Sequence, residues 1–174
     1  MFKNVLVAID GSDHSRRAAD IAADMAKKYG AKLVLLHVVG NGKVPASLAR
    51  MLEVEHMTEA ERPRSPNVAN VAGGIATAER GTDSREHEEE MKEAVAKMLL
   101  AGAEHTAKNK GVLDVSLITE HGDPVGRILE CAARESTDLI VMGSRGLSDL
   151  RGLLMGSVSH KICQLSECTC ITVK

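Results

Sequence analysis

Three apolar runs, each closed by a turn or a glycine, constrain the fold of this 174-residue chain more than any other feature. They occupy Val5–Ile9, Leu33–Val39 and residues 138–142. Strands that are apolar throughout are typical of a parallel sheet covered on both faces. Between the runs, apolar residues recur at helical spacing, as Ala18 and Ala22 do after the first run. The pattern therefore predicts strands that alternate with helices.

The complete pattern predicts five strands and four main helices. The strands are expected at 5–9, 33–39, 112–119, 138–142 and 168–173, and the helices after residue 12, after Asp83 or Ser84, after Asp123 and after Gly156. The run at 112–119 is interrupted by polar residues, which is typical of an edge strand. Such alternation predicts an α/β fold, with a parallel sheet sandwiched by helices and a ligand crevice at the carboxyl ends of the strands.

The alternation of strand and helix patterns is interrupted at about residues 40–84, which contain three of the four prolines. We interpret the chain as one domain, 1–174, with a long variable insertion at 40–84. Within it, residues 47–57 have the pattern of a short amphipathic helix. Because the insertion follows the second strand, it leaves the sheet at the ligand edge. We therefore expect part of 43–70 to lie over the ligand or to form a partner surface.

A glycine-rich loop follows the fourth strand. Gly143 and Gly146 come directly after the strand, and Gly156-Ser157 opens the next helix after nine further residues. A flexible surface loop is one interpretation. The other is an anion site, in which glycines adopt positive φ and allow the first helical amides to approach phosphate. Ser157 and Ser159 would add hydroxyl donors.

Composition and motif spacing exclude several classes of protein. One Phe, one Tyr and a net charge of −2 leave neither stacking platforms nor a basic surface for nucleic acid. No apolar run approaches the roughly 18 residues of a membrane span, and no signal peptide is expected. Neither the P-loop nor the Rossmann dinucleotide spacing occurs. The four cysteines favour core packing over a metal site, and a cytoplasmic location.

The combined motifs resemble those of the universal stress protein family. The resemblance rests on the opening from Asn4 to Ser12, on Leu35–Val39, on Gly122-Asp123-Pro124 and on the loop from Gly143 to Ser157. It implies an adenine-nucleotide α-hydrolase-like (Rossmann-like) fold with strand order 3-2-1-4-5. Because the glycine pattern is complete, the chain resembles the ATP-binding branch. The family also implies a homodimer through the last strand, about Cys168–Val173, where Thr169 replaces a frequent proline.

The resemblance also implies which residues would bind ATP, together with Mg²⁺ or Mn²⁺ held mainly by phosphate oxygens and water. Those expected near the base and ribose are Ala8, Ile9, Asp10, Val38, Met142 and Gly143; those expected around the ribose and phosphates are Ser144, Arg145, Gly146, Gly156, Ser157, Val158 and Ser159.

No catalytic residue is assigned, because no general base stands beside a water-positioning group in the pattern. His37 is interpreted as a satisfied core histidine, and His14 and His160 have no carboxylate partner evident in the sequence. We expect a nucleotide-dependent stress-response module that acts on an unknown protein partner, with at most slow ATP hydrolysis. Two alternatives stay open: a genuine ATP hydrolase or phosphotransferase, and a dimeric interaction protein that does not depend on nucleotide.

Overall fold

The structure, a computed structural model, describes residues 1–52, 83–147 and 155–174. The chain divides into two compact units, Met1–Gly42 with Ala96–Lys174, and Lys43–Val95, which are described separately. In the second unit, residues 46–52 are helical and Leu48 is buried. The rest of the helix expected at 47–57, and most of the 43–70 segment expected near the ligand, lie outside the described residues. The single-domain organisation stays a prediction.

The first unit contains a five-stranded sheet in which every pair of neighbouring strands is parallel. Its strands are β1 (Asn4–Ala8), β2 (Lys32–Val39), β3 (Val115–His121), β4 (Leu139–Gly143) and β5 (Thr169–Val173). The order β3-β2-β1-β4-β5 confirms the expected α/β fold and strand order, and β3 is an edge strand as predicted.

The start of β3 differs from the prediction by three residues. Val112 was expected in the strand, but its N–H donates to the carbonyl of Ala107 over 3.1 Å and so closes the preceding helix. Gly111 permits this with φ +91°, a left-handed conformation that favours glycine. The capping bonds of the helix therefore compete with the strand for these residues.

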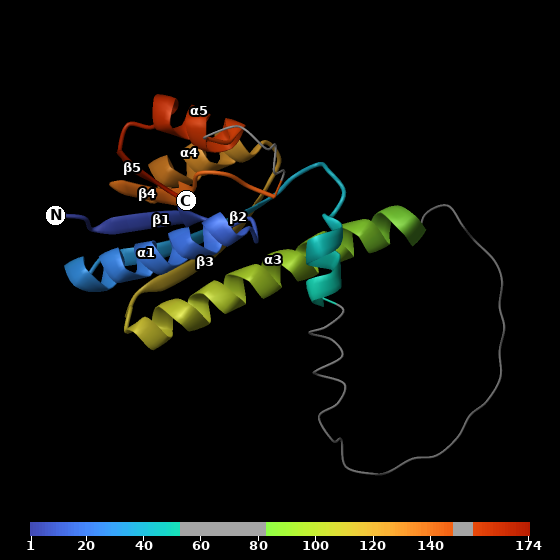
Figure 1. The fold of residues 1–174 in the computed structure, drawn as a ribbon, viewed down its shortest axis with the longest axis horizontal. Coiled ribbons are helices and arrows are strands. Elements are labelled where there is room, and N and C mark those ends of the chain that lie inside the picture. Colours follow the sequence, from blue (N-terminus) through green and yellow to red (C-terminus); the bar gives the residue numbers. More distant parts are fainter. Residues whose placement is uncertain (53–82, 148–154) are drawn as a thin grey trace, which may run out of the picture. The chain divides into compact units, whose positions relative to one another are not determined.

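Helices cover both faces of the sheet. α1 (Asp13–Tyr29) and the part of α3 (Asp83–Lys110) that belongs to the first unit lie on one face, and α4 (Pro124–Arg134) and α5 (Ser157–Leu165) lie on the other (Figure 1). Successive strand residues point to opposite faces, so Val5 and Val7 pack toward α1 whereas Leu6 packs toward α4 and α5. The core is thus aliphatic and forms two layers, one on each face of the sheet.

Cys131 is buried, Cys168 and Cys170 are half-buried and Cys163 is exposed. The prediction that the four cysteines pack in the core is therefore fully confirmed only for Cys131. In the described ranges, no helix combines the length and the apolarity needed to cross a bilayer.

Candidate nucleotide site

Three connections meet at one edge of the sheet. The chain leaves β1 at Ala8, β2 at Val39 and β4 at Gly143, and the carboxyl ends of these parallel strands lie at the same edge. β1 lies between β2 and β4, so the chain order reverses beside β1. In open α/β sheets this reversal is where ligands bind.

A cavity of about 260 Å³ opens at this edge, within the first unit. Of the predicted site residues, all but Ser144 line it. The described lining consists of Ala8, Ile9, Asp10, Ser15, Leu36, Val38, Pro124, Ile128, Met142, Gly143, Arg145, Gly146, Met155, Gly156, Ser157, Val158 and Ser159. The structure therefore brings together residues from β1, β2, β4 and α5 that the sequence separates by up to about 150 positions.

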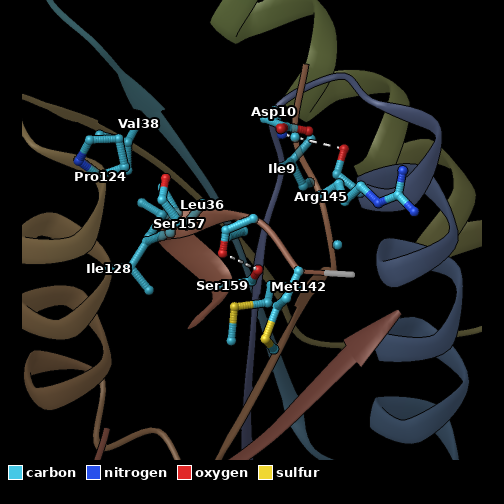
Figure 2. A pocket seen from close by; sticks show the side chains of 17 residues that line it. Ile9, Asp10, Leu36, Val38, Pro124, Ile128, Met142, Arg145, Ser157 and Ser159 are labelled. Carbon is cyan, nitrogen blue, oxygen red and sulfur yellow. Dashed lines mark hydrogen bonds between the residues drawn. The ribbon is translucent and has the colours of Figure 1, made fainter. Parts of the chain in front are cut away.

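The cavity has an apolar side and a polar side. Val38, Pro124 and Ile128 lie together on one side, whereas Asp10 and Arg145 lie on the other (Figure 2). Asp10 and Arg145 are the only charged side chains among the lining residues that the structure describes. A ligand with a flat apolar part and a polar part matches this division.

The start of α5 offers backbone donors to the cavity. Its N-cap is Gly156, with φ −75° and ψ 160°, and no side chain caps the helix. The Gly156 N–H donates to the carbonyl of Ser144 over 2.7 Å, which fixes the entry into the helix. Ser157 is exposed at the first turn. Uncapped amides at the positive end of a helix dipole form an anion-binding arrangement.

The two serines expected as hydroxyl donors differ in the structure. Ser159 is 4% exposed, and its hydroxyl lies 2.9 Å from the Ser144 carbonyl and 3.0 Å from the Gly156 carbonyl. Since carbonyls only accept, this hydroxyl proton is used within the chain. Ser157 keeps its side chain at the cavity. Ser159 thus shapes the loop, and Ser157 is the better candidate for contacting an anion.

Ser144 lies behind the cavity rather than in its lining. It is 2% exposed, and its N–H donates to the Val173 carbonyl over 2.7 Å. Its hydroxyl lies 3.0 Å from Nδ1 of His14 in the first turn of α1. His14, for which the sequence showed no carboxylate partner, therefore lies within hydrogen-bond distance of a hydroxyl in the loop.

The glycines of the loop are required for a different reason than predicted. Positive φ was expected, but Gly156 has φ −75°, and neither Gly143 nor Gly146 is left-handed. That part of the prediction is wrong. A Cβ on Gly143 would stand 2.9 Å from Cβ of His14, and one on Gly146 would stand 2.6 Å from Oδ2 of Asp10. Close packing of the loop on the first turn of α1, and not backbone conformation, excludes a side chain at Gly143, whereas at Gly146 the Asp10 side chain would have to move.

His37 supports the site from the core. It is 9% exposed, and its Nδ1 lies 2.7 Å from the carbonyl of Ile9. Because a carbonyl only accepts, Nδ1 carries a proton. The interpretation of a satisfied core histidine is confirmed, and the bond fixes the peptide that precedes Asp10. The Asp10 carboxylate in turn accepts the Ser12 N–H over 3.0 Å.

Nucleophilic and metal chemistry find little support in the described residues. The described lining contains none of the four cysteines. Burial raises the pKa of the Cys131, Cys163 and Cys168 thiols, which disfavours the reactive thiolate. Within the described ranges, no group of three or more His, Cys, Asp or Glu side chains could hold a metal ion.

Sequence reasoning missed five lining residues: Ser15, Leu36, Pro124, Ile128 and Met155. Two signals were available. Leu36 and Val38 are two apart on β2 and therefore share a face of the sheet. Pro124 and Ile128 are four apart on α4, which begins at the same sheet edge, so they share a face of that helix. Nothing in the pattern marked Met155.

The fold and this cavity define an α/β protein with an open helix N-terminus beside an apolar pocket at the reversal point of the sheet. The family model described as "Universal stress protein family" matches residues 1–78 and 58–174. The chain therefore belongs to the universal stress protein family. Universal stress protein YxiE of Bacillus subtilis is 36% identical over 174 residues, which span all of both chains.

Solved structures give the same result. A universal stress protein in complex with cAMP is 26% identical, with a TM-score of 0.63, over 99% of this chain and 97% of that one. A family protein of Arabidopsis thaliana with AMP bound is 19% identical, with a TM-score of 0.60, over 99% of this chain and 91% of that one. The second likeness concerns the fold alone. Nucleotide binding is thus found in some relatives.

Proposed function

We propose that this chain binds ATP at the cavity and acts as a nucleotide-dependent regulatory module of the stress response. The observation that carries the proposal is the start of α5, whose backbone amides have no side-chain cap and whose residues Gly156, Ser157 and Val158 line the cavity. The related structure with cAMP supports an adenine nucleotide as the class of ligand.

The base would lie on the apolar side of the cavity. Val38 and Met142 come from strands β2 and β4, and Pro124 and Ile128 come from α4. Adenine is a flat ring with a large apolar face, so it gains from removing this surface from water. The binding of the base would therefore depend on strands and α4, and not on the glycine loop.

The phosphates would lie at the start of α5. A Cβ on Gly156 would approach Arg145 Cα and the Ser144 carbonyl only to 3.5 Å, so the chain itself leaves room there. The glycine keeps the N-terminus bare and leaves the amides of the first turn for a ligand. Charge-assisted bonds from these amides to phosphate are among the stronger hydrogen bonds in proteins.

A divalent cation, Mg²⁺ or Mn²⁺, would accompany the triphosphate and neutralise part of its charge. Phosphate oxygens and water would supply most of its ligands. Asp10 is the one carboxylate in the described lining, and one of its oxygens already accepts a bond from Ser12. The protein's own contribution to holding the cation is accordingly small.

ATP hydrolysis by this chain would be slow. Asp10 and Arg145 are the charged groups of the described lining, and Figure 2 shows the Arg145 guanidinium directed away from Val38, Pro124 and Ile128. Fast hydrolysis requires a group that positions water in line with the γ-phosphate. A single-turnover assay with Mg²⁺ tests this: rapid γ-phosphate release dependent on the protein would favour a hydrolase or phosphotransferase instead.

The module would act as a cytoplasmic homodimer with a further protein partner. β5 is an edge strand of the described sheet, with β4 on one side. Thr169 retains an N–H that a proline would lack, so this position presents no proline that would limit pairing with a strand from a second copy. Sedimentation equilibrium of the purified chain tests the dimer, and a monomer at micromolar concentration would contradict it.

Titration calorimetry of the purified protein tests nucleotide binding. ATP with Mg²⁺ should give saturable heat at one site per chain, and adenosine should bind more weakly because it lacks the phosphates. Mass spectrometry of small molecules released from the protein would identify a nucleotide that purifies with it. If neither ATP nor ADP binds and none is released, the chain is an interaction protein independent of nucleotide.

A further inference from the structure

A chain of hydrogen bonds, half-buried at His14 and buried at Ser159, connects the first turn of α1 with the first turn of α5. Nδ1 of His14 lies 3.0 Å from the Ser144 hydroxyl, and the Ser144 carbonyl accepts from the Ser159 hydroxyl over 2.9 Å. The same carbonyl accepts the Gly156 N–H over 2.7 Å. Two helices that begin at the sheet edge are thus joined through one residue of the loop.

Every polar group of Ser144 lies within hydrogen-bond distance of a partner. Its N–H is bonded to Val173, its carbonyl to Gly156 and Ser159, and its hydroxyl to His14. At 2% exposure, a hydroxyl without its partner would be buried unsatisfied, which is costly. The residue has little freedom to take another position while these bonds persist.

The backbone and Cβ of His14 also lie close to Gly143 at the start of the loop. A Cβ on Gly143 would meet both Cβ and the backbone carbon of His14, at 2.9 and 3.0 Å. In addition, the Ser12 hydroxyl lies 3.5 Å from the Arg145 carbonyl. The first turn of α1 therefore packs directly against the start of the loop, and His14 contributes its polar side chain there.

We propose that His14 is a positioning residue for the phosphates, acting through Ser144 on the N-terminus of α5. His14 does not line the cavity, so it would act on the phosphates through other residues. The inference rests on the proposed function. Removing the imidazole would release the Ser144 hydroxyl and loosen the carbonyl that fixes Gly156, so the amides of the first turn of α5 would lose their alignment.

The effect would be selective for the phosphates. The apolar side of the cavity comes from β2, β4 and α4, and Ser144 contacts none of Val38, Pro124 and Ile128 through the bonds described here. Adenosine, which lacks phosphates, would therefore bind the variant about as well as the parent. A general loss of structure would instead weaken both ligands.

Calorimetry with ATP and with adenosine on four proteins tests this: the parent, His14→Leu, His14→Asn and Ser144→Ala. Asparagine places a polar atom where Nδ1 stands, whereas leucine fills similar space without one. His14→Leu and Ser144→Ala should each weaken ATP about tenfold, the equivalent of one hydrogen bond, and leave adenosine within about twofold. His14→Asn should stay within about threefold of the parent for ATP.

The double variant, His14→Leu with Ser144→Ala, should bind ATP no more weakly than either single variant, because both remove the same link. If the parent binds ATP and His14→Leu binds it equally well, or if adenosine is lost in proportion, the inference is overturned while the proposed function stands. If His14→Leu does not fold, Ser144→Ala and His14→Asn still decide. A parent that binds no ATP would overturn both.

Discussion

The helices α4 and α5 begin at the same edge of the sheet, and their N-termini are completed in different ways. At α4, the Asp123 side chain accepts the Gly126 N–H over 2.9 Å, and Pro124 removes a donor from the first turn. At α5, Gly156 stands in the same position and offers no side-chain acceptor. α1 follows the α4 pattern, with Ser12 as its cap.

In α1 and α4, side chains of the protein accept hydrogen bonds from the N-terminal amides. In α5, these amides remain available to a ligand. A capped N-terminus stabilises its own helix and has less to offer an anion. An uncapped one gives up that stabilisation and keeps its amides available. Beside a cavity, we expect the first kind to contribute packing and the second to contribute binding. This expectation can be tested at both helices.

The largest effect is expected from giving α5 the cap that α4 has. In Gly156→Asp, the carboxylate would accept the amides of the first turn and repel phosphate, so ATP affinity should fall by about 100-fold or more. The fold should gain a few tenths of a kcal/mol. Calorimetry and urea denaturation measure the two quantities.

Gly156→Ala is the matched control for that variant, because a Cβ there meets only ordinary contacts of 3.5 Å or more. It lacks an acceptor oxygen, so its ATP affinity should stay well above that of Gly156→Asp. Equal affinities for both variants would mean that α5 amides do not bind phosphate.

A second effect concerns the close packing of the loop. Gly143→Ala would force Cβ to within 2.9 Å of Arg145 O and His14 Cβ, so the loop or α1 must shift. We expect the free energy of unfolding to fall by about 1–3 kcal/mol. Gly40→Ala, with open space around the added Cβ, is the control. Denaturation curves that coincide with the parent for both variants would refute the steric explanation.

Removing the cap of α4 should lower the stability of the protein and leave its ATP affinity unchanged, whereas Gly156→Asp should raise stability and lower ATP affinity. Asp123→Ala leaves the Gly126 N–H without its acceptor and should cost about 0.5–2 kcal/mol of stability. ATP affinity should be unchanged, because α4 contributes apolar contacts to the cavity. Asp123→Ser, which keeps an acceptor, should recover most of the stability. A large loss of ATP affinity at unchanged stability would show that both helix starts bind the ligand.

The smallest effect concerns the far end of α4. Glu135, its C-cap residue, is paired with Lys32 over 2.8 Å. The hydrogen bond to Lys32 lowers the pKa of Glu135 from 4.5, and the same bond raises the pKa of Lys32 from 10.5. Glu135→Gln should cost up to about 1 kcal/mol at neutral pH.

The sign of the pH dependence follows from these shifts. The contribution of Glu135 is complete above its ordinary pKa and is lost as pH falls through the lowered one. That of Lys32 is complete below 10.5 and is lost as pH rises through the raised value. The stability difference between parent and variant should therefore be greatest between about pH 5 and 10 and vanish at both extremes. A difference independent of pH would mean that the pair contributes nothing.

The sequence predicted the sheet because strand and helix periods are local. Apolar runs such as Val5–Ile9 indicate strands by themselves, and alternation then limits the topology. The strand order came from the resemblance and is confirmed by the pairing of β1 with β2 and β4. Boundaries were less predictable, as Val112 shows, because capping bonds decide them.

The details of the site depend on contacts that no local pattern encodes. His14 and Ser144 are 130 positions apart, and nothing in either neighbourhood marks the other. The role of Gly143 was assigned to backbone conformation because neighbours in space are invisible in the sequence. All the residues expected near ATP except Ser144 line one cavity, but which of them contact a ligand stays a prediction.

The bond between Ser144 and Val173 joins the loop to the last strand of the sheet. A displacement of β5 along its axis would move Ser144, and with it the entry into α5. Ser144 is therefore bonded both to the outer strand β5 and, through its carbonyl, to the residue that opens α5.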